Sequence, residues 1–251
     1  ISFFAAKERV APAKSRTAAG DIRALLGNKN WRVLFFISCL TLVGLVCRVS
    51  SIIYYFKYHV LESAPHLADG VDPTAVFTAI GFLGPIVGAF ISPFLTKRFE
   101  KCMVILVMNG LHAVFLATSF FIPPEMFAVN VMLHFLGLTT FGVTLTMLFA
   151  MYTDCSVFEQ WNSGENTAGL TQASLLFAMK FGSAGGAAIP GFTLGIVGFV
   201  ANEVQTEQAI LGIQLMFTAI PALLFLSAAL LALFYKLDRT TIESIEAELH
   251  A

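Results

Sequence analysis

The sequence predicts an all-α membrane protein with six transmembrane helices. Hydrophobic residues make up 57% of the 251-residue chain and charged residues only 12%, and the mean hydropathy is +0.79. A soluble globule of this size needs more polar surface than this composition supplies. The apolar residues form continuous runs, and about 20 apolar residues span about 30 Å of hydrocarbon as a helix. Because continuous runs do not fit the alternating pattern of a barrel strand, they favour helices.

The apolar runs divide the chain into one transmembrane domain with two flanking segments. Residues 1–30 are basic and mostly polar, and we expect them to form a cytoplasmic loop with an amphipathic segment. The transmembrane domain covers residues 31–235, and residues 236–251 form a short cytoplasmic tail. The chain begins at Ile1 without a signal-peptide pattern, so we expect an upstream partner half. The predicted spans are residues 31–57, 74–96, 102–122, 126–151, 167–199 and 209–235.

Basic residues indicate the orientation of the chain. They precede the first span and follow the second and the sixth, at Lys7, Arg9, Lys14, Arg16, Arg23, Lys29, Arg32, Lys97, Arg98, Lys101, Lys236 and Arg239. If six spans alternate, all these flanks share one side, which the positive-inside rule assigns to the cytoplasm. We therefore expect a multi-pass protein of the inner (cytoplasmic) membrane with both termini in the cytoplasm. The connection between the fourth and fifth spans lies on the same side, but it carries acids and no Lys or Arg.

Motifs for most enzyme classes are missing from the sequence. There is no CxxC, HExxH, GxGxxG or Walker-type GxxxxGK[ST] pattern, and no spacing that pairs a nucleophile with a base. We therefore expect no enzyme activity, no metal site, no cofactor and no nucleic-acid partner. The expected partners are the lipid bilayer and a small molecule.

Two charged residues lie inside the predicted spans, Lys180 and Arg48. A bare ammonium in hydrocarbon costs roughly 3 kcal/mol on insertion scales, and Lys180 is too central to reach the interface. It should therefore face a partner or a water-filled cavity. On a helical wheel Gln172 lies on the same side as Lys180, whereas Thr171 points the opposite way. Lys180 and Gln172 are thus predicted to line a substrate or cation pathway.

The first span carries a second polar stripe. Arg48, Ser51 and Tyr55 are spaced i, i+3, i+7 and share one helix face, where they offer a cation, a hydroxyl and an aromatic ring. Sugars bind to such groups, so Arg48 and Tyr55 are predicted to belong to the same pathway as Lys180. An alternative for Arg48 is an interface anchor whose side chain snorkels outward.

Pairs of glycines four residues apart predict close helix packing. Such pairs let two helices approach closely in a membrane. In the fifth span, which also contains Pro190, a hinge around a midplane site is the alternative. The pairs are Gly84-xxx-Gly88, Gly182-xxx-Gly186 and Gly191-xxx-Gly195.

Several short motifs resemble those of the glycoside-pentoside-hexuronide:cation symporters. The resemblance covers nearly the whole chain. It implies a twelve-helix major facilitator fold, of which this chain matches the C-terminal six helices, arranged as two inverted three-helix repeats. The motifs are Tyr54-Tyr-Phe-Lys-Tyr58, Lys97-Arg98, Asp154 with Glu159-Gln-Trp161 and Gly164, and Lys180-Phe-Gly-Ser183.

The resemblance also implies a function and roles for single residues. It implies secondary active transport of a glycoside, pentoside or hexuronide by alternating access, coupled to Na⁺ or H⁺. Lys180 matches the lysine of the family's sugar and cation pathway, and Arg48 and Tyr55 match positions of the seventh helix. Asp154 matches the acid that opens a loop of the cytoplasmic gate, to which we also assign Glu159. An uncoupled sugar facilitator and a non-transporting membrane sensor that retained the half-fold are the alternatives.

Overall fold

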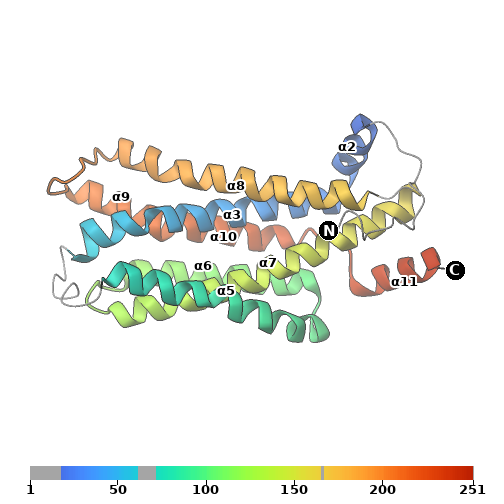
Figure 1. Cartoon of the computed structure of the whole chain (residues 1–251), viewed down its shortest axis with the longest axis horizontal. Helices are drawn as coiled ribbons and strands as arrows, with labels where there is room; N and C mark the ends of the chain where they lie inside the picture. The colour runs from blue at the N-terminus through green and yellow to red at the C-terminus, as the bar shows by residue number, and fades with distance from the viewer. Residues whose placement is uncertain (1–17, 62–71, 165–166, 251) are drawn as a thin grey trace, which may run out of the picture.

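Six long apolar helices form the body of the protein in a computed structural model that describes residues 18–61, 72–164 and 167–250. They lie side by side as an elongated bundle (Figure 1). Each is long and apolar enough to cross a membrane, which confirms the predicted six spans. The spans are α3 (Lys29–Tyr55) continued by η1 (Phe56–Val60), α5 (Pro73–Arg98), α6 (Lys101–Phe121), α7 (Phe127–Ser163), α8 (Ala168–Ile196), and α9 (Glu207–Phe217) continued by α10 (Ala219–Ala232).

The spans pack as two equivalent sets of three. The first helix of the first set, α3, packs against α8 and α10 of the second set. The first helix of the second set, α7, packs in the same way against α5 and α6 of the first set. The third helices of the two sets, α6 and α10, also contact each other. This exchange of partners is the pattern of two inverted three-helix repeats, and it gives half of a twelve-helix major facilitator fold.

Glycines allow α8 to lie close to α3, and α5 to lie close to α7. A Cβ on Gly182 would lie 2.8 Å from a backbone oxygen of α3, and one on Gly186 would lie 2.6 Å from another. Gly84 and Gly88 of α5 meet the backbone of α7 in the same way. Real Cβ atoms do not approach other atoms so closely, so these positions accept only glycine at this helix spacing. The close packing predicted for both pairs is confirmed.

The second half of α8 differs from the first. A Cβ on Gly191 or Gly195 would have no atom within 4 Å among the described residues, so this pair forms no seam there. The helix also continues without interruption through Pro190, from Ala168 to Ile196.

The fourth span is longer than its apolar run. We predicted an end near residue 151 and a loop that contains Asp154 and Glu159, but α7 continues to Ser163 and is capped by Gly164, which has φ 72°. Both acids are buried in this helical extension. The prediction of a loop was wrong because polar residues stop a membrane-spanning run without stopping a helix whose polar groups find partners.

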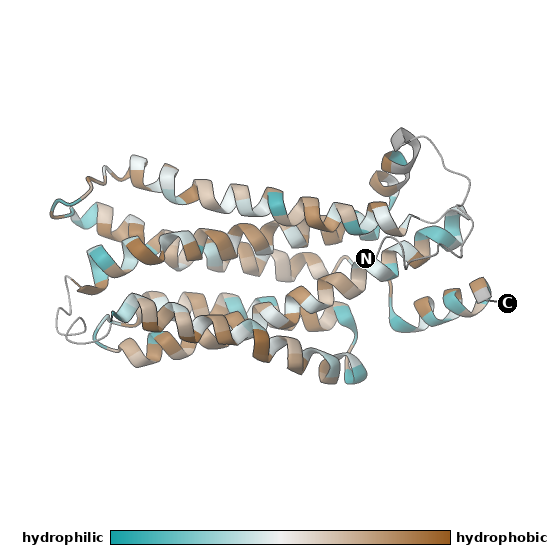
Figure 2. Cartoon of the chain, viewed as in Figure 1, coloured by the Kyte–Doolittle hydropathy of each residue, from teal (hydrophilic) through white to brown (hydrophobic). Residues whose placement is uncertain are grey.

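Two short helices lie at one end of the bundle, α2 (Ala18–Gly27) and α11 (Arg239–His250) (Figure 1). Leu25 of α2 is buried, and so are Ile242 and Ile245 of α11, so both helices pack on the bundle through apolar side chains. We call this the α2–α11 end, and the opposite one, which carries η1, the η1 end. Hydrophilic residues gather mainly at these two ends and along α11 (Figure 2). The cytoplasmic location of the α2–α11 end stays a prediction.

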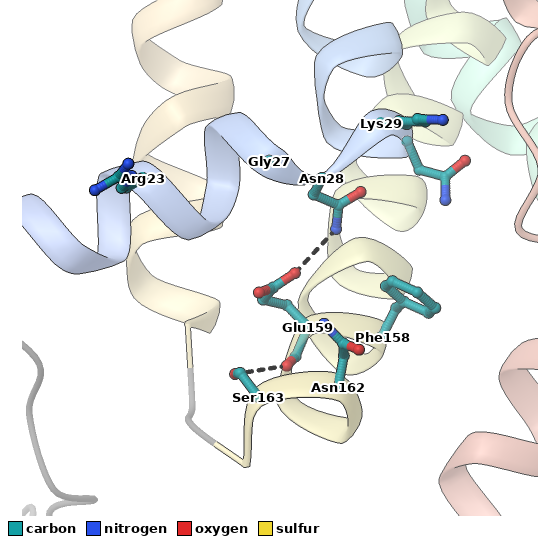
Figure 3. A pocket seen from close by; sticks show the side chains of 9 residues that line it. Arg23, Gly27, Asn28, Lys29, Phe158, Glu159, Asn162 and Ser163 are labelled. Atoms are coloured by element: carbon teal, nitrogen blue, oxygen red, sulfur yellow. Dashed lines mark hydrogen bonds between the residues drawn. The ribbon is translucent and has the colours of Figure 1, made fainter.

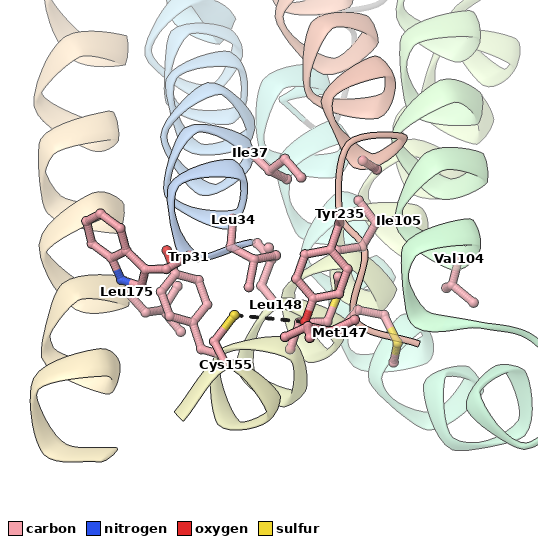
Figure 4. Close-up of a cluster of buried hydrophobic side chains, with 14 of the residues drawn as sticks. Trp31, Leu34, Ile37, Val104, Ile105, Met147, Leu148, Cys155, Leu175 and Tyr235 are labelled. Atoms are coloured by element: carbon pink, nitrogen blue, oxygen red, sulfur yellow. Dashed lines mark hydrogen bonds between the residues drawn. The ribbon is translucent and has the colours of Figure 1, made fainter. Parts of the chain in front are cut away.

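A cluster of buried side chains closes the bundle toward the α2–α11 end (Figure 4). It joins Trp31 and Leu34 of α3, Ile105 of α6, Met147 of α7, and Tyr235, which follows α10. The cluster holds the ends of helices from both repeats together.

Candidate functional site

Lys180 lies on an exposed face of α8. Its neighbours on this side are apolar, with Phe177 60% and Phe181 62% exposed. No hydrogen bond or ion pair joins Lys180 to another residue in the described parts of the chain. Thr171 is fully buried on the opposite side, as the helical wheel predicted. That this face of α8 borders a polar cavity stays a prediction, which rests on the cost of an ammonium in hydrocarbon.

Gln172 lies closer to the α2–α11 end. Its Nε2 donates a hydrogen bond to Thr153 Oγ1 of α7 at 3.2 Å. Eight residues of α-helix separate Gln172 from Lys180, or about 12 Å along the axis. The two side chains thus share a side of α8 without touching, and Gln172 lies where α8 meets α7.

Arg48 and Tyr55 lie inside the bundle, 2% and 3% exposed. The Arg48 guanidinium donates to the Phe217 carbonyl oxygen at 2.8 Å through Nη1, and Nε donates to His134 Nδ1 at 3.4 Å. The Tyr55 ring stacks on the Phe217 ring with centroids 3.9 Å apart. The predicted stripe with Ser51 therefore exists, but it faces α9 and α7. The alternative that Arg48 snorkels to the interface is wrong.

The structure does not bring Lys180 and Gln172 of α8 together with Arg48 and Tyr55 of α3. The face of α3 that packs on α8 carries Cys39 and Val43, which meet Gly182 and Gly186. Arg48 points to another side of the same helix. Among the described residues no contact joins Lys180 to Arg48 or Tyr55. Their common role in a substrate pathway stays a prediction.

Asp154 forms an ion pair that the sequence did not reveal. Lys101 Nζ at the start of α6 donates to Asp154 Oδ1 at 2.8 Å and to Oδ2 at 2.6 Å. Beside this pair, the backbone N–H of Arg239 at the start of α11 donates to Glu100 Oε2 at 3.1 Å. In the sequence, the feature that points to this pair is the position of Lys101, which follows Lys97-Arg98 on the same side of the membrane as Asp154. The pair ties the first repeat to the second.

Glu159 joins the end of α7 to the start of α3. Its carboxylate is buried and accepts a hydrogen bond from Asn28 Nδ2 at 3.1 Å (Figure 3). Asn28 also caps α3, because its Oδ1 accepts from the Trp31 backbone N–H at 3.1 Å. A cavity of about 590 Å³ opens beside Glu159, and Arg23 and Lys29 contribute to its lining. The same end of α7 also contacts α11, because Trp161 Nε1 donates a hydrogen bond to Glu248 Oε2 at 2.8 Å.

The two equivalent repeats, the mid-span lysine and the paired charges at one end together define a membrane transporter of the major facilitator type. Residues 1–239 match the family model described as MFS/sugar transport protein, and the chain belongs to this family. The resemblance to glycoside-pentoside-hexuronide:cation symporters is confirmed by its relatives. The family consists of transporters, so the protein is not an enzyme.

Two of the relatives carry names of glycoside or sugar transporters. The chain is 28% identical to the putative glycoside/cation symporter YagG of Escherichia coli (strain K12), over 99% of this chain and 53% of that protein. It is 26% identical to the isoprimeverose transporter of Lactiplantibacillus pentosus, over 95% of this chain and 49% of that protein. An uncharacterized 29.9 kDa protein of Pseudescherichia vulneris is 32% identical, over 82% of this chain and 73% of that protein. The chain thus spans about half the length of the two named transporters.

Proposed function

We propose that this chain is the C-terminal half of a secondary active sugar transporter that couples uptake of a glycoside, pentoside or hexuronide to Na⁺ or H⁺. In this proposal a six-helix N-terminal half completes the transporter in the inner membrane, and both ends of this chain face the cytoplasm. Support comes from the family of the chain, from the names of its relatives and from its span of about half their length. The N-terminal half supplies the second wall of a central cavity, and the two halves rock about the bound substrate.

Lys180 is the observation that carries the proposal. Its charged group lies in the middle of a span, it is exposed on α8, and it has no partner among the described residues. A bilayer does not supply polar atoms at this depth, whereas a water-filled cavity between two halves does. A sugar hydroxyl or carboxylate can then accept hydrogen bonds from the ammonium group, which fits a glycoside or a hexuronide.

Asp154 and Glu159 serve in this mechanism as parts of the cytoplasmic gate. Asp154 connects α7 to α6, and Glu159 connects α7 to the start of α3. Both contacts join helices of this half, so rocking of the halves does not separate them, and in this proposal they hold the helix ends in the arrangement that closes against the N-terminal half. The free energy of these pairs therefore contributes to the equilibrium between the two orientations of the transporter.

Replacing Asp154 by asparagine is expected to change the rate of transport more than the binding of sugar. The Lys101–Asp154 pair is mostly buried and bidentate, so its loss changes the gate equilibrium by about 1 kcal/mol, or roughly fivefold. Initial uptake rates and equilibrium sugar binding measure the two effects separately. Lys101→Asp combined with Asp154→Lys is expected to recover part of the rate. An equal loss of sugar affinity in Asp154→Asn would contradict the role in the gate.

Uptake of radiolabelled sugars into membrane vesicles tests the proposed function. The complete protein is supplied with glycosides, pentosides and hexuronides, with and without an imposed Na⁺ or H⁺ gradient. We expect accumulation of at least one of them above equilibrium when the right gradient is present. Equilibration without accumulation would identify an uncoupled facilitator, and no uptake of any sugar would favour the membrane sensor.

A further inference from the structure

The last span is interrupted near its middle. α9 ends at Phe217, Thr218 has φ −126° and ψ −69°, and α10 starts at Ala219. In an unbroken α-helix the carbonyl of residue 217 would accept a hydrogen bond from the N–H of residue 221. That residue is Pro221, which has no N–H. The helical bonding resumes with Ala222, whose N–H donates to the Thr218 carbonyl at 2.9 Å.

The interruption leaves the Phe217 carbonyl without a helical partner inside a membrane-spanning bundle. An unpaired backbone carbonyl is costly there because no lipid group can donate to it. Two side chains of α3 supply donors instead. Arg48 Nη1 donates to the Phe217 carbonyl at 2.8 Å, and Cys47 Sγ donates to the Met216 carbonyl at 3.3 Å. The Ser51 hydroxyl donates within its own helix, to the Cys47 carbonyl at 2.6 Å.

The charge of Arg48 also fits this place. The carboxyl end of α9 carries the negative end of its helix dipole, which favours a cation. The guanidinium carbon lies 4.1 Å from the centroid of the Phe217 ring, within the range of a cation–π contact. His134 accepts from the guanidinium Nε. Two of the five N–H donors of Arg48 thus have partners inside the protein, and its charge lies beside the Phe217 ring.

Further contacts connect α9 to the η1 end of α3. The Gln214 side-chain amide lies 2.7 Å from His59 Nε2 of η1. Tyr55 stacks on the Phe217 ring at the end of α9. All these contacts lie on the η1 side of the interruption, whereas α10 beyond it packs on α6 and on the remainder of α3.

We propose that Arg48 is a positioning residue that caps the interruption of the last span and holds α9 against the η1 end of α3. In this role it acts on transport through the backbone of α9 and does not contact the sugar. Cys47 completes the cap at the neighbouring Met216 carbonyl. The proposal goes beyond the transport function, because it holds whether the complete protein is a symporter or a sensor.

A double-mutant cycle between Arg48 and Pro221 tests this role in the complete protein. Arg48→Met removes the donor and is expected to lower the midpoint of thermal unfolding by roughly 5 °C. Pro221→Ala restores an N–H that can bond to the Phe217 carbonyl. When Pro221→Ala is already present, Arg48→Met is expected to lower the midpoint of thermal unfolding by half as much or less. Pro190→Ala is the matched control, since it removes a proline from the interior of α8 and should leave the loss unchanged.

Sugar uptake by the same variants separates capping from substrate contact. If Arg48 is a cap, uptake lost in Arg48→Met returns at least in part in the double variant with Pro221→Ala. If Arg48→Met lowered the thermal midpoint and the uptake by the same amount with and without Pro221→Ala, the proposal would be overturned. Arg48→Lys gives a second test that does not depend on Pro221, because it keeps a charged donor. The thermal midpoint of Arg48→Lys is expected to be higher than that of Arg48→Met. Identical midpoints for these two variants would also overturn the proposal.

Discussion

Replacing Lys180 with alanine is expected to abolish gradient-driven sugar accumulation by the complete protein, with initial uptake lowered by roughly 10- to 100-fold. A hydrogen bond from a charged donor to a ligand contributes about 1.5–3 kcal/mol, which corresponds to that range. The fold is expected to be unaffected, because Lys180 is exposed and bonds to no described residue. Uptake in vesicles measures the first effect, and the amount of inserted protein and its thermal midpoint measure the second.

The neighbouring residue provides the control for this experiment. Phe181 follows Lys180 and is also exposed, so Phe181→Ala changes the same region of α8 without touching the charge. It is expected to keep most of the uptake. Lys180→Arg keeps the cation and is expected to retain more activity than Lys180→Ala. Unchanged accumulation in Lys180→Ala would remove this residue from the transport mechanism.

Replacing Gly186 with valine is expected to prevent correct folding of the bundle. The added Cβ would lie 2.6 Å from the Val43 carbonyl oxygen and 3.0 Å from the Cys47 backbone nitrogen. These are backbone atoms of α3, so relief requires the two helices to separate. Excess packing costs about 1–3 kcal/mol when side chains alone must adjust, and we expect more here. The measurements are the yield of monodisperse protein in detergent and a thermal midpoint lower by roughly 5 °C or more.

The same helix offers a matched substitution for comparison. Gly191 has no atom within 4 Å of its Cβ position among the described residues, so Gly191→Val tests valine in α8 without the contact to α3. Its yield and midpoint are expected to stay closer to those of the unmodified protein. If Gly186→Val and Gly191→Val had the same small effect, the α3–α8 seam would not control folding.

The spans could be predicted from the sequence because their cause is local. A stretch that crosses hydrocarbon must be apolar over the whole thickness of the bilayer, and this requirement is visible in the composition of each run. The predicted run 102–122 and the helix Lys101–Phe121 differ by one residue at each end. The prediction failed at α7, since its extension from residue 152 to Ser163 lies beyond the apolar run. Hydrophobicity does not mark the end of a helix outside the membrane.

The candidate site could be predicted only in part. The depth of Lys180 and the common face of Arg48 and Tyr55 follow from helical geometry. The partners of these side chains do not, because they come from helices far away in the sequence. Arg48 bonds to Phe217, 169 residues away, and Lys101 bonds to Asp154, 53 residues away. Neither pairing has a local signature.

The sequence by itself determined that the protein crosses a membrane with six helices, that Lys180 lies at mid-span and that the chain resembles a sugar symporter. Composition, helical period and motif order are properties of short segments, so they can be read without a fold. Only the tertiary structure decided that Arg48 faces α9 and that Asp154 pairs with Lys101. Those outcomes depend on the rotation of each helix about its axis and on which helices become neighbours. Both are fixed by side-chain packing between the two repeats, which no single segment contains.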